Sequence, residues 1–344
     1  MKTRAPRRRS RHAAVLVLAA VLLVAVAVLS LGTGDFSLTP DRVLAALGGG
    51  GTRQESVIVT AVRLPRILAG LAVGAALAVS GAIVQTLARN ALASPDLLGV
   101  TAGASAGAVA VITLGGTGGV VSGALREVGV PLAAAGGAAV AALLVALLLR
   151  RTGTRGLQPL LVGIGVSIFF GGLVSWMMTE ADITDAARAN VWLTGSLNGR
   201  SWPELWPVVV VLLLAAVVLV PIARHLAALA LGVDVARGLG VGIRPVVTVY
   251  LLVAVLLAAV ATSAAGPIGF VALVAPHLAR MACGATRPPL LASALLGALL
   301  VAVTDLVART VIAPILLPVG AVVAVVGAPF LVWLLVSSRR KATS

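Results

Sequence analysis

The sequence predicts an all-α polytopic membrane protein with about ten transmembrane helices. Of the 344 residues, 60% are hydrophobic and 11% are charged, whereas soluble domains carry about 25% charged residues. The apolar residues form continuous runs of roughly 20, the length of a helix that spans a bilayer. The runs lack the polar–apolar alternation of membrane β-strands. This composition excludes a soluble globular enzyme and a disordered chain.

The first apolar run, 13–31, follows a basic N-terminus, 1–12. A secretory signal has this arrangement, but the run is long for a signal core and no clear small-x-small cleavage site follows it. We therefore interpret it as the first transmembrane helix of a single transmembrane domain, 13–336, which a basic tail, 337–344, completes. The other nine spans are predicted at 65–84, 97–114, 131–149, 159–178, 205–222, 246–264, 268–282, 289–304 and 318–336. The 38 glycines are expected to let these helices pack closely.

The basic residues are divided unequally between the two sides of the predicted spans. With the N-terminus in the cytoplasm, 18 of the 26 Lys and Arg residues but only two of the 11 Asp and Glu residues fall inside. The positive-inside rule therefore places both termini in the cytoplasm. The net charge of +15 is a topology signal and does not indicate nucleic-acid binding, because aromatic residues for base stacking make up only 3% of the chain.

Several kinds of chemistry are not expected. Cys283 is the single cysteine, and the three histidines are far apart in sequence, so the sequence predicts neither an internal disulfide nor a metal cluster. The two lysines follow no phosphate-binding loop, so ATP hydrolysis by that route is not expected. The spans are nearly empty of charge, which disfavours an ion-coupled secondary transporter, although backbone carbonyls can also bind ions.

Two polar stretches flank the second span. At its outer start, two arginines surround Pro65 in the sequence Arg63-Leu64-Pro65-Arg66, where proline suits a first helical turn. This stretch is either an interfacial anchor or a cationic patch for an acidic partner. At the inner end, Ser94-Pro95-Asp96 is a plausible helix start, with Ser94 as the cap.

The inner segment 224–244 is long for a membrane connector. It predicts two short helices, broken at Gly232 and closed at Gly240, with leucines on one face. Such a segment either docks onto a soluble partner or lies on the membrane surface. Further on, Pro276 is expected to distort a short span, and His277 and Arg280 are expected to share a helix face.

Together these stretches resemble the permease subunits of iron-chelate and vitamin B12 ABC importers, the FecCD family. The resemblance covers nearly the whole chain and depends on the order and spacing of blocks that are each weak alone. The matching blocks are Arg63-Leu64-Pro65-Arg66, Gln85 with Arg89-Asn90, 94–99, 192–197, 231–240, 266–270, 276–280, Asp305 with Arg309, 318–320 and 327–330.

The resemblance implies ten helices per subunit and an assembly of several chains. The expected partners are a second permease subunit, identical or paralogous, two ATP-binding subunits that hold ATP and Mg²⁺, and an extracytoplasmic substrate-binding protein. This chain itself is expected to hold no cofactor or metal and to lie in the lipid of a bacterial inner membrane.

The resemblance also implies roles for individual residues. Arg63, Arg66 and Arg309 match arginines that pair with glutamates of the binding protein, and Asn90 and Leu92 match a cytoplasmic gate. The residues that match the ATPase-coupling helices are Leu231, Gly232, Asp234, Ala236, Arg237, Leu239 and Gly240.

Three positions depart from the family pattern. Ala91 replaces a proline in the gate block, which is expected to loosen the turn. Leu316 stands where relatives usually have a glutamate, so a carboxylate pairing made there cannot form. Ala272 replaces a frequent glycine and is expected to affect packing only.

The sequence thus predicts the permease subunit of an ATP-driven importer of a ferric siderophore, not an enzyme. A permease for vitamin B12 or haem is the alternative within the family. An ion-coupled secondary transporter and a structural membrane scaffold are alternatives of other classes.

Overall fold

The computed structural model describes residues 5–34, 36–114, 124–152, 158–312 and 315–342, and the regular elements in these ranges are all helices. Lys2, Arg4 and Arg155, which contributed to the predicted charge asymmetry, lie outside the described residues. So do the ends of the two basic termini, at 1–4 and 343–344.

The ten predicted spans fall on ten separate helices, which confirms the predicted fold class. Seven of these helices contain a stretch long and apolar enough to cross a membrane. They are α1 (Ala5–Gly32), α4 (Leu64–Ala88), α6 (Ala124–Thr152), α7 (Gln158–Glu180), α9 (Trp202–Leu231), α11 (Ile243–Ala265) and α13 (Leu290–Thr310). The other three contain shorter apolar stretches and are α5 (Val100–Leu114), α12 (Val271–Cys283) and α14 (Val319–Ala342).

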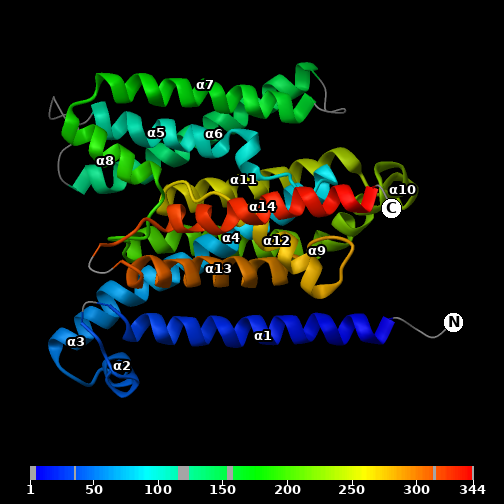
Figure 1. The fold of residues 1–344 in the computed structure, drawn as a ribbon. Coiled ribbons are helices and arrows are strands. Elements are labelled where there is room, and N and C mark those ends of the chain that lie inside the picture. The colour runs from blue at the N-terminus through cyan, green and yellow to red at the C-terminus, as the bar shows by residue number, and fades with distance from the viewer. Residues whose placement is uncertain (1–4, 35, 115–123, 153–157, 313–314, 343–344) are drawn as a thin grey trace.

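Six short elements connect the long helices. They are α2 (Pro40–Leu47), α3 (Arg53–Val57), the π-helix η1 (Ile58–Arg63), the 3₁₀-helix η2 (Pro95–Leu98), α8 (Ile183–Leu193) and α10 (Val233–Gly238). Most of them were not predicted, because they are too short to produce a continuous apolar run. Helices α2, α3 and α8 lie at one end of the bundle and α10 at the other (Figure 1). We call these the α2 end and the α10 end.

Helix α4 runs through the middle of the bundle and is buried along most of its length (Figure 1). It shares one apolar core with helices α9, α11, α12 and α13. A second core joins α5, α6 and α7, and Ala258 and Ala259 of α11 connect it to the first. Helices α1 and α7 lie outermost, and each buries only about a fifth of its apolar stretch (Figure 1).

Glycines in α4 allow its neighbours to approach backbone to backbone. A Cβ atom on Gly81 would overlap the carbonyl of Ala272 in α12, and one on Gly74 would overlap the carbonyl of Gly297 in α13. Helices α5 and α6 meet in the same way at Gly103. This confirms the expected role of glycine in helix packing.

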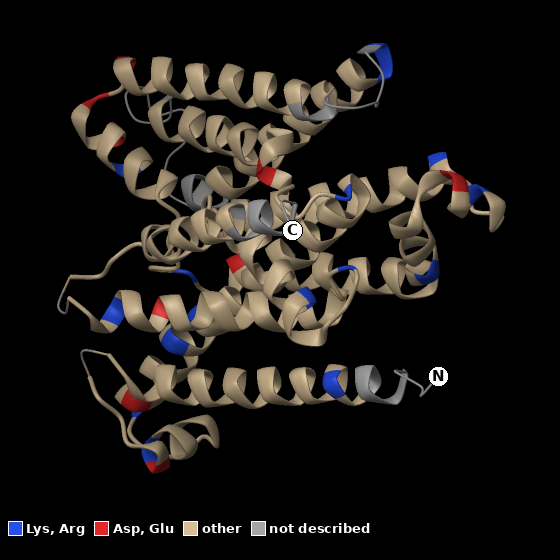
Figure 2. Cartoon of the chain, turned by 45° about the vertical axis from the view of Figure 1, so that its right-hand side comes forward, with Lys and Arg blue, Asp and Glu red and all other residues tan. Residues whose placement is uncertain are grey.

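Charge is distributed unequally between the two ends. Both chain termini lie at the α10 end, whereas most of the acidic residues gather at the α2 end (Figures 1 and 2). The N-terminal part of α1 is tied to the α10 end, because Arg11 donates hydrogen bonds to the carbonyls of Ala282 (2.7 Å) and Met281 (3.2 Å) at the end of α12.

Candidate functional site

The second predicted span begins earlier than the sequence indicated. A capping box between Thr52 and Glu55 starts a helix that continues through α3, η1 and α4. Pro65 lies in the first turn of α4, as predicted, but the chain before it is already helical. The π register explains how Pro65 is accommodated. Proline has no N–H, and in a π-helix the N–H of each residue bonds to the carbonyl five residues earlier, so Pro65 leaves the carbonyl of Thr60 without its helical donor. The indole Nε1 of Trp202 donates to this carbonyl instead, at 3.3 Å.

Arg63, at the end of the π-helix, is 7% exposed and serves the fold. Its Nη1 donates to the carbonyl of Leu31 (2.6 Å), and its Nη2 donates to the carbonyl of Phe36. Arg63 therefore fixes the end of α1 and the connection that follows it against α4.

Arg66, Asp305 and Arg309 form a buried cluster at the α2 end, which we call the arginine–aspartate cluster. Arg66 donates to Oδ1 of Asp305 from Nη2 (2.8 Å) and Nε (3.1 Å). The Nε of Arg309 lies 3.1 Å from Oδ2 of Asp305, although its N–H is not aligned for a hydrogen bond. The side chains of Arg66, Asp305 and Arg309 are 11%, 5% and 7% exposed.

Arg309 keeps donors that no described residue satisfies. Its Nε faces Asp305, but its Nη2 is buried without a hydrogen-bond partner among the described atoms. One carboxylate thus serves two guanidinium groups, so the cluster carries an excess of positive charge and of N–H donors. A carboxylate that approached Arg309 would find both an opposite charge and unpaired donors.

Three of the glycine-containing sequence blocks meet beside this cluster. The N–H of Ser196 donates to the carbonyl of Ala265 (2.8 Å), and the N–H of Gly320 donates to that of Gly195 (3.0 Å). Gly195 has φ +69°, and a Cβ there would overlap the carbonyl of Pro267. The turns after α8, after α11 and before α14 therefore form one hydrogen-bonded junction.

At the α10 end, Asn90 builds the turn that follows α4. Arg89 ends the helix with a left-handed conformation (φ +49°), and the side-chain Oδ1 of Asn90 accepts a hydrogen bond from the N–H of Leu92 at 2.9 Å. Asn90 is exposed and Leu92 is half-buried. The turn is thus closed by hydrogen bonds with Ala91 in place of the family's proline. The Ser94 cap is also as predicted, since its hydroxyl accepts from the N–H of Asp96.

The segment 224–244 contains one short helix and not the predicted two. Helix α9 continues to Leu231, and the break comes at Gly232, whose φ of +130° few other residues adopt. Helix α10 follows, capped by Leu239, and Gly240 (φ +77°) comes next. The break at Gly232 was therefore predicted correctly, whereas the first short helix is the end of α9.

Helix α10 buries one side and exposes apolar residues on the other. Within α10, Ala236 is fully buried and Val235 is 48% exposed, and the flanking Leu231 and Leu239 are 69% and 65% exposed. Asp234 and Arg237 form an exposed ion pair at 3.5 Å. Exposed leucines beside a charged pair at the end of a bundle suit a surface that binds another protein or one that lies on the membrane.

Helix α12 continues through Pro276. The proline frees the carbonyl of Ala272, and the side-chain Nε2 of Gln85 compensates by donating to the carbonyls of Leu273 (3.0 Å) and Ala272 (3.5 Å). The predicted proximity of His277 and Arg280 is confirmed, since Nη2 of Arg280 lies 3.3 Å from Nδ1 of His277.

A bundle with this many apolar helices, a buried cationic cluster at one end and a short exposed helix at the other has the architecture of a polytopic membrane protein. The profile of the FecCD transport family matches residues 22–337. The chain belongs to this family, whose members are transport subunits and not enzymes.

The relatives cover nearly the whole chain. The ferric enterobactin transport system permease protein FepG of Escherichia coli is 39% identical over 95% of this chain and 98% of its own. The vitamin B12 import system permease protein BtuC of Salmonella typhi is 34% identical over 99% of this chain and 100% of its own. A solved metal-chelate type ABC transporter in an inward-facing conformation is 30% identical, covers 94% of this chain and 98% of its own, and superposes with a TM-score of 0.80.

Proposed function

We propose that the chain is the permease subunit of a binding-protein-dependent ABC importer that carries a ferric siderophore across the cytoplasmic membrane. The observation that carries this proposal is membership of the FecCD family together with 39% identity to a ferric enterobactin permease. The chain would pair with a second permease subunit, and the chelate would pass between the two. ATP and Mg²⁺ would be bound by two separate ATPase subunits.

The α10 end would face the cytoplasm. Among the described residues, Arg11 bonds to the end of α12, Arg89 lies beside Gly232 and Arg224 lies near the end of α9, whereas the acidic residues of this end are Asp96 in η2 and Asp234 in α10. The positive-inside rule supports this orientation, which places both termini inside. The α2 end would then meet the substrate-binding protein.

The arginine–aspartate cluster would receive a carboxylate of the binding protein. Its support is the unpaired Nη2 of Arg309, beside an Asp305 that Arg309 already shares with Arg66. Because this Nη2 is buried, docking would require a small shift that opens the cluster. Arg63 would contribute indirectly, since it holds the adjoining backbone in place.

At the other end, α10 would fit a groove on the ATPase through Leu231, Leu239 and the Asp234–Arg237 pair. Gly232 and Gly240 would allow it to move relative to α9 and α11. Closure of the ATPases would push α10, and the turn formed by Asn90 and Leu92 would open or close the path. Weak contacts along the path would let a bulky chelate leave as readily as it enters.

Vitamin B12 is the second candidate cargo, because BtuC is 34% identical over its full length. The two cargoes are separated by uptake in cells with and without this chain. We expect ⁵⁵Fe supplied as a siderophore to enter only cells that contain the chain, with no competition from excess cobalamin. Iron uptake that is independent of the chain for every chelate tested would overturn the proposal, and competition by cobalamin or haem would reassign the cargo.

A further inference from the structure

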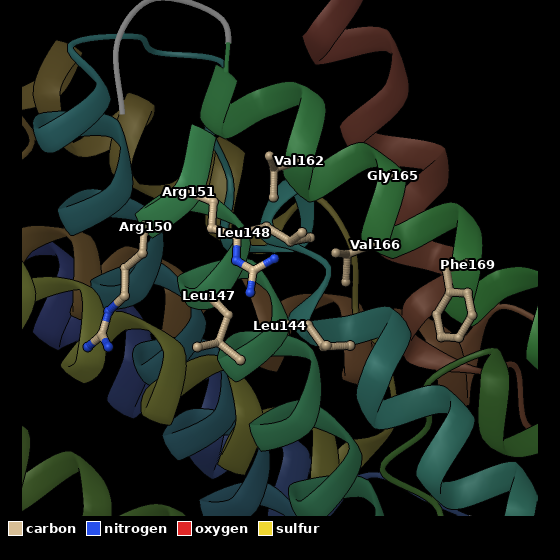
Figure 3. Close-up of a pocket in the computed structure, with 9 residues that line it drawn as sticks. All are labelled: Leu144, Leu147, Leu148, Arg150, Arg151, Val162, Gly165, Val166 and Phe169. Carbon is tan, nitrogen blue, oxygen red and sulfur yellow. The ribbon is translucent and has the colours of Figure 1, made fainter. Parts of the chain in front are cut away.

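A groove of about 730 Å³ opens on the surface between α6 and α7, near the α10 end (Figure 3). The residues along its length are apolar, and two arginines stand where α6 ends. Its lining residues are Leu144, Leu147, Leu148, Arg150, Arg151, Val162, Gly165, Val166 and Phe169. None of them belongs to the arginine–aspartate cluster, the gate turn or α10.

The two arginines are available to an external anion. Arg150 and Arg151 are exposed, and neither forms an ion pair with any residue of the described ranges. They occupy consecutive positions in the last turn of α6. The backbone carbonyl dipoles at the end of a helix stabilise positively charged side chains. Together they form a doubly cationic rim.

The apolar part of the groove extends from this rim toward the middle of the membrane. From Arg151 to Leu144 the helix rises roughly 10 Å, at about 1.5 Å per residue. Phe169 is 62% exposed and Leu147 is 47% exposed, so the groove is open to the surroundings of the chain. A molecule that fits both the cationic rim and the apolar groove has an anionic head group attached to an extended apolar tail.

We propose that this groove binds an anionic phospholipid, with the phosphate against Arg150 and Arg151 and an acyl chain along the groove between α6 and α7. Basic pockets between membrane helices on the cytoplasmic side select anionic headgroups. The proposed orientation of the chain decides only which leaflet supplies the lipid. With the α10 end in the cytoplasm, it would be the cytoplasmic leaflet. A second copy of this chain fits the rim less well, since the described acidic residues of its α10 end are Asp96 and Asp234.

Substitutions can test the head and tail contacts separately. R150Q/R151Q removes the cationic rim, and R224Q/R244Q is its control, because Arg224 and Arg244 are also exposed, near the end of α9 and at the start of α11. G165L fills the groove, since a Cβ on Gly165 meets nothing within 4 Å. G172L is its control, because Gly172 lies on the same helix with equally open space but does not line the groove.

The full-length chain would be reconstituted in phosphatidylcholine nanodiscs containing a trace of photo-activatable phosphatidylglycerol, and labelling of α6 and α7 would be mapped by mass spectrometry. We expect R150Q/R151Q to weaken competition by unlabelled phosphatidylglycerol about tenfold to thirtyfold. G165L should abolish labelling, and both controls should behave as the unchanged chain.

Equal labelling of all five proteins, or equal losses in R150Q/R151Q and R224Q/R244Q, would overturn the proposal. So would labelling that phosphatidylcholine or free inorganic phosphate suppresses as well as phosphatidylglycerol does. Loss of the second permease subunit from G165L, with lipid labelling intact, would assign the groove to a subunit contact. The readout needs no transport, so a failure of the proposed cargo leaves it unaffected.

Discussion

Nη2 of Arg66 lies 2.8 Å from Oδ1 of Asp305, although 239 positions separate the two residues in the sequence. The contact joins the start of α4 to the last turns of α13, and Arg309 approaches the same carboxylate from one helical turn further on. A single buried negative charge therefore holds two buried positive charges together at the α2 end.

Asp305→Asn should destabilise the protein strongly, because it leaves two buried guanidinium groups without a counter-charge. Loss of one partner of a buried ion pair costs about 3–5 kcal/mol, whereas exposed pairs contribute about 0–1 kcal/mol. Asp234→Asn is the matched control, since Asp234 is 98% exposed in its pair with Arg237. Thermal unfolding of the purified proteins measures the difference, and equal midpoints for the two variants would contradict the assigned burial.

Arg309→Gln should weaken docking of the binding protein while leaving the Arg66–Asp305 contact in place. The expected loss of affinity is roughly ten- to a hundredfold, as for one charge-assisted hydrogen bond. Arg42→Gln is the control, because Arg42 is 60% exposed at the same end and pairs with Glu55. Surface plasmon resonance with the binding protein gives both affinities. A larger loss in Arg42→Gln would place the docking site on α2.

Leu239→Asp should release the ATPase subunits, because it introduces a charge into the exposed apolar surface of α10. Arg237→Gln should retain them, since its exposed ion pair is worth little. Co-purification of the ATPase with each variant measures the association. Retention in Leu239→Asp would argue that α10 lies on the membrane surface instead.

Gly81→Ala should be destabilising, because the new methyl group would overlap the carbonyl of Ala272 and force α4 and α12 apart. Overpacking of this kind costs about 1–3 kcal/mol or more. Gly171→Ala makes the same chemical change on α7 where nothing lies within 4 Å, and it should add about 0.5–1 kcal/mol of stability. The sign of the difference in thermal midpoint is the test, and two variants shifted in the same direction would refute the packing.

Stability should depend on the titration of Asp96, which lies in η2 outside the spans. Burial raises the pKa of this carboxyl above its usual 3.8, and hydrogen bonds from Thr101 and Ser94 oppose the rise only in part. The folded protein therefore holds this proton more tightly than the unfolded chain does. Stability falls as the pH rises from 3.8 through the raised pKa.

Asp96→Asn should remove the loss of stability that ionisation of Asp96 causes. The thermal midpoint of the variant relative to that of the unchanged chain should therefore increase as the pH rises from 3.8 through the raised pKa, and the difference should stay constant at higher pH. Asp41 provides a control of opposite sign, because a hydrogen bond from the Thr39 side chain lowers the pKa of its carboxyl. Asp41→Asn should therefore lose stability relative to the unchanged chain at neutral pH and regain it in acid. A difference for Asp96→Asn that does not vary with pH would contradict the assigned pKa.

The ten spans could be predicted from the sequence because each apolar run is long enough to be recognised as a membrane-spanning helix. The start of the second span at Arg53 could not be predicted, because the capping box of Thr52 and Glu55 lies among polar residues that are typical of a loop. The π-helix was also missed, because its acceptor at Thr60 is satisfied by Trp202 from another part of the chain.

The candidate site was predictable only where the interactions are local. Asp305 and Arg309 lie four positions apart, so their proximity on one helix face could be anticipated. That Arg66 joins them depends on the packing of α4 against α13, which the sequence alone does not specify. The burial of Arg63, which faces the backbone and not the exterior, was likewise hidden until the end of α1 was placed.

The proposed activity of this permease is movement of a ferric chelate at the expense of ATP hydrolysed by other subunits. Its most direct test is uptake of a ⁵⁵Fe-labelled siderophore by proteoliposomes that contain the assembled complex, with the binding protein outside and ATP inside. We predict uptake that requires both ATP and the binding protein and that persists when ionophores collapse the ion gradients. Uptake without ATP that ionophores abolish would contradict the account and identify an ion-coupled carrier.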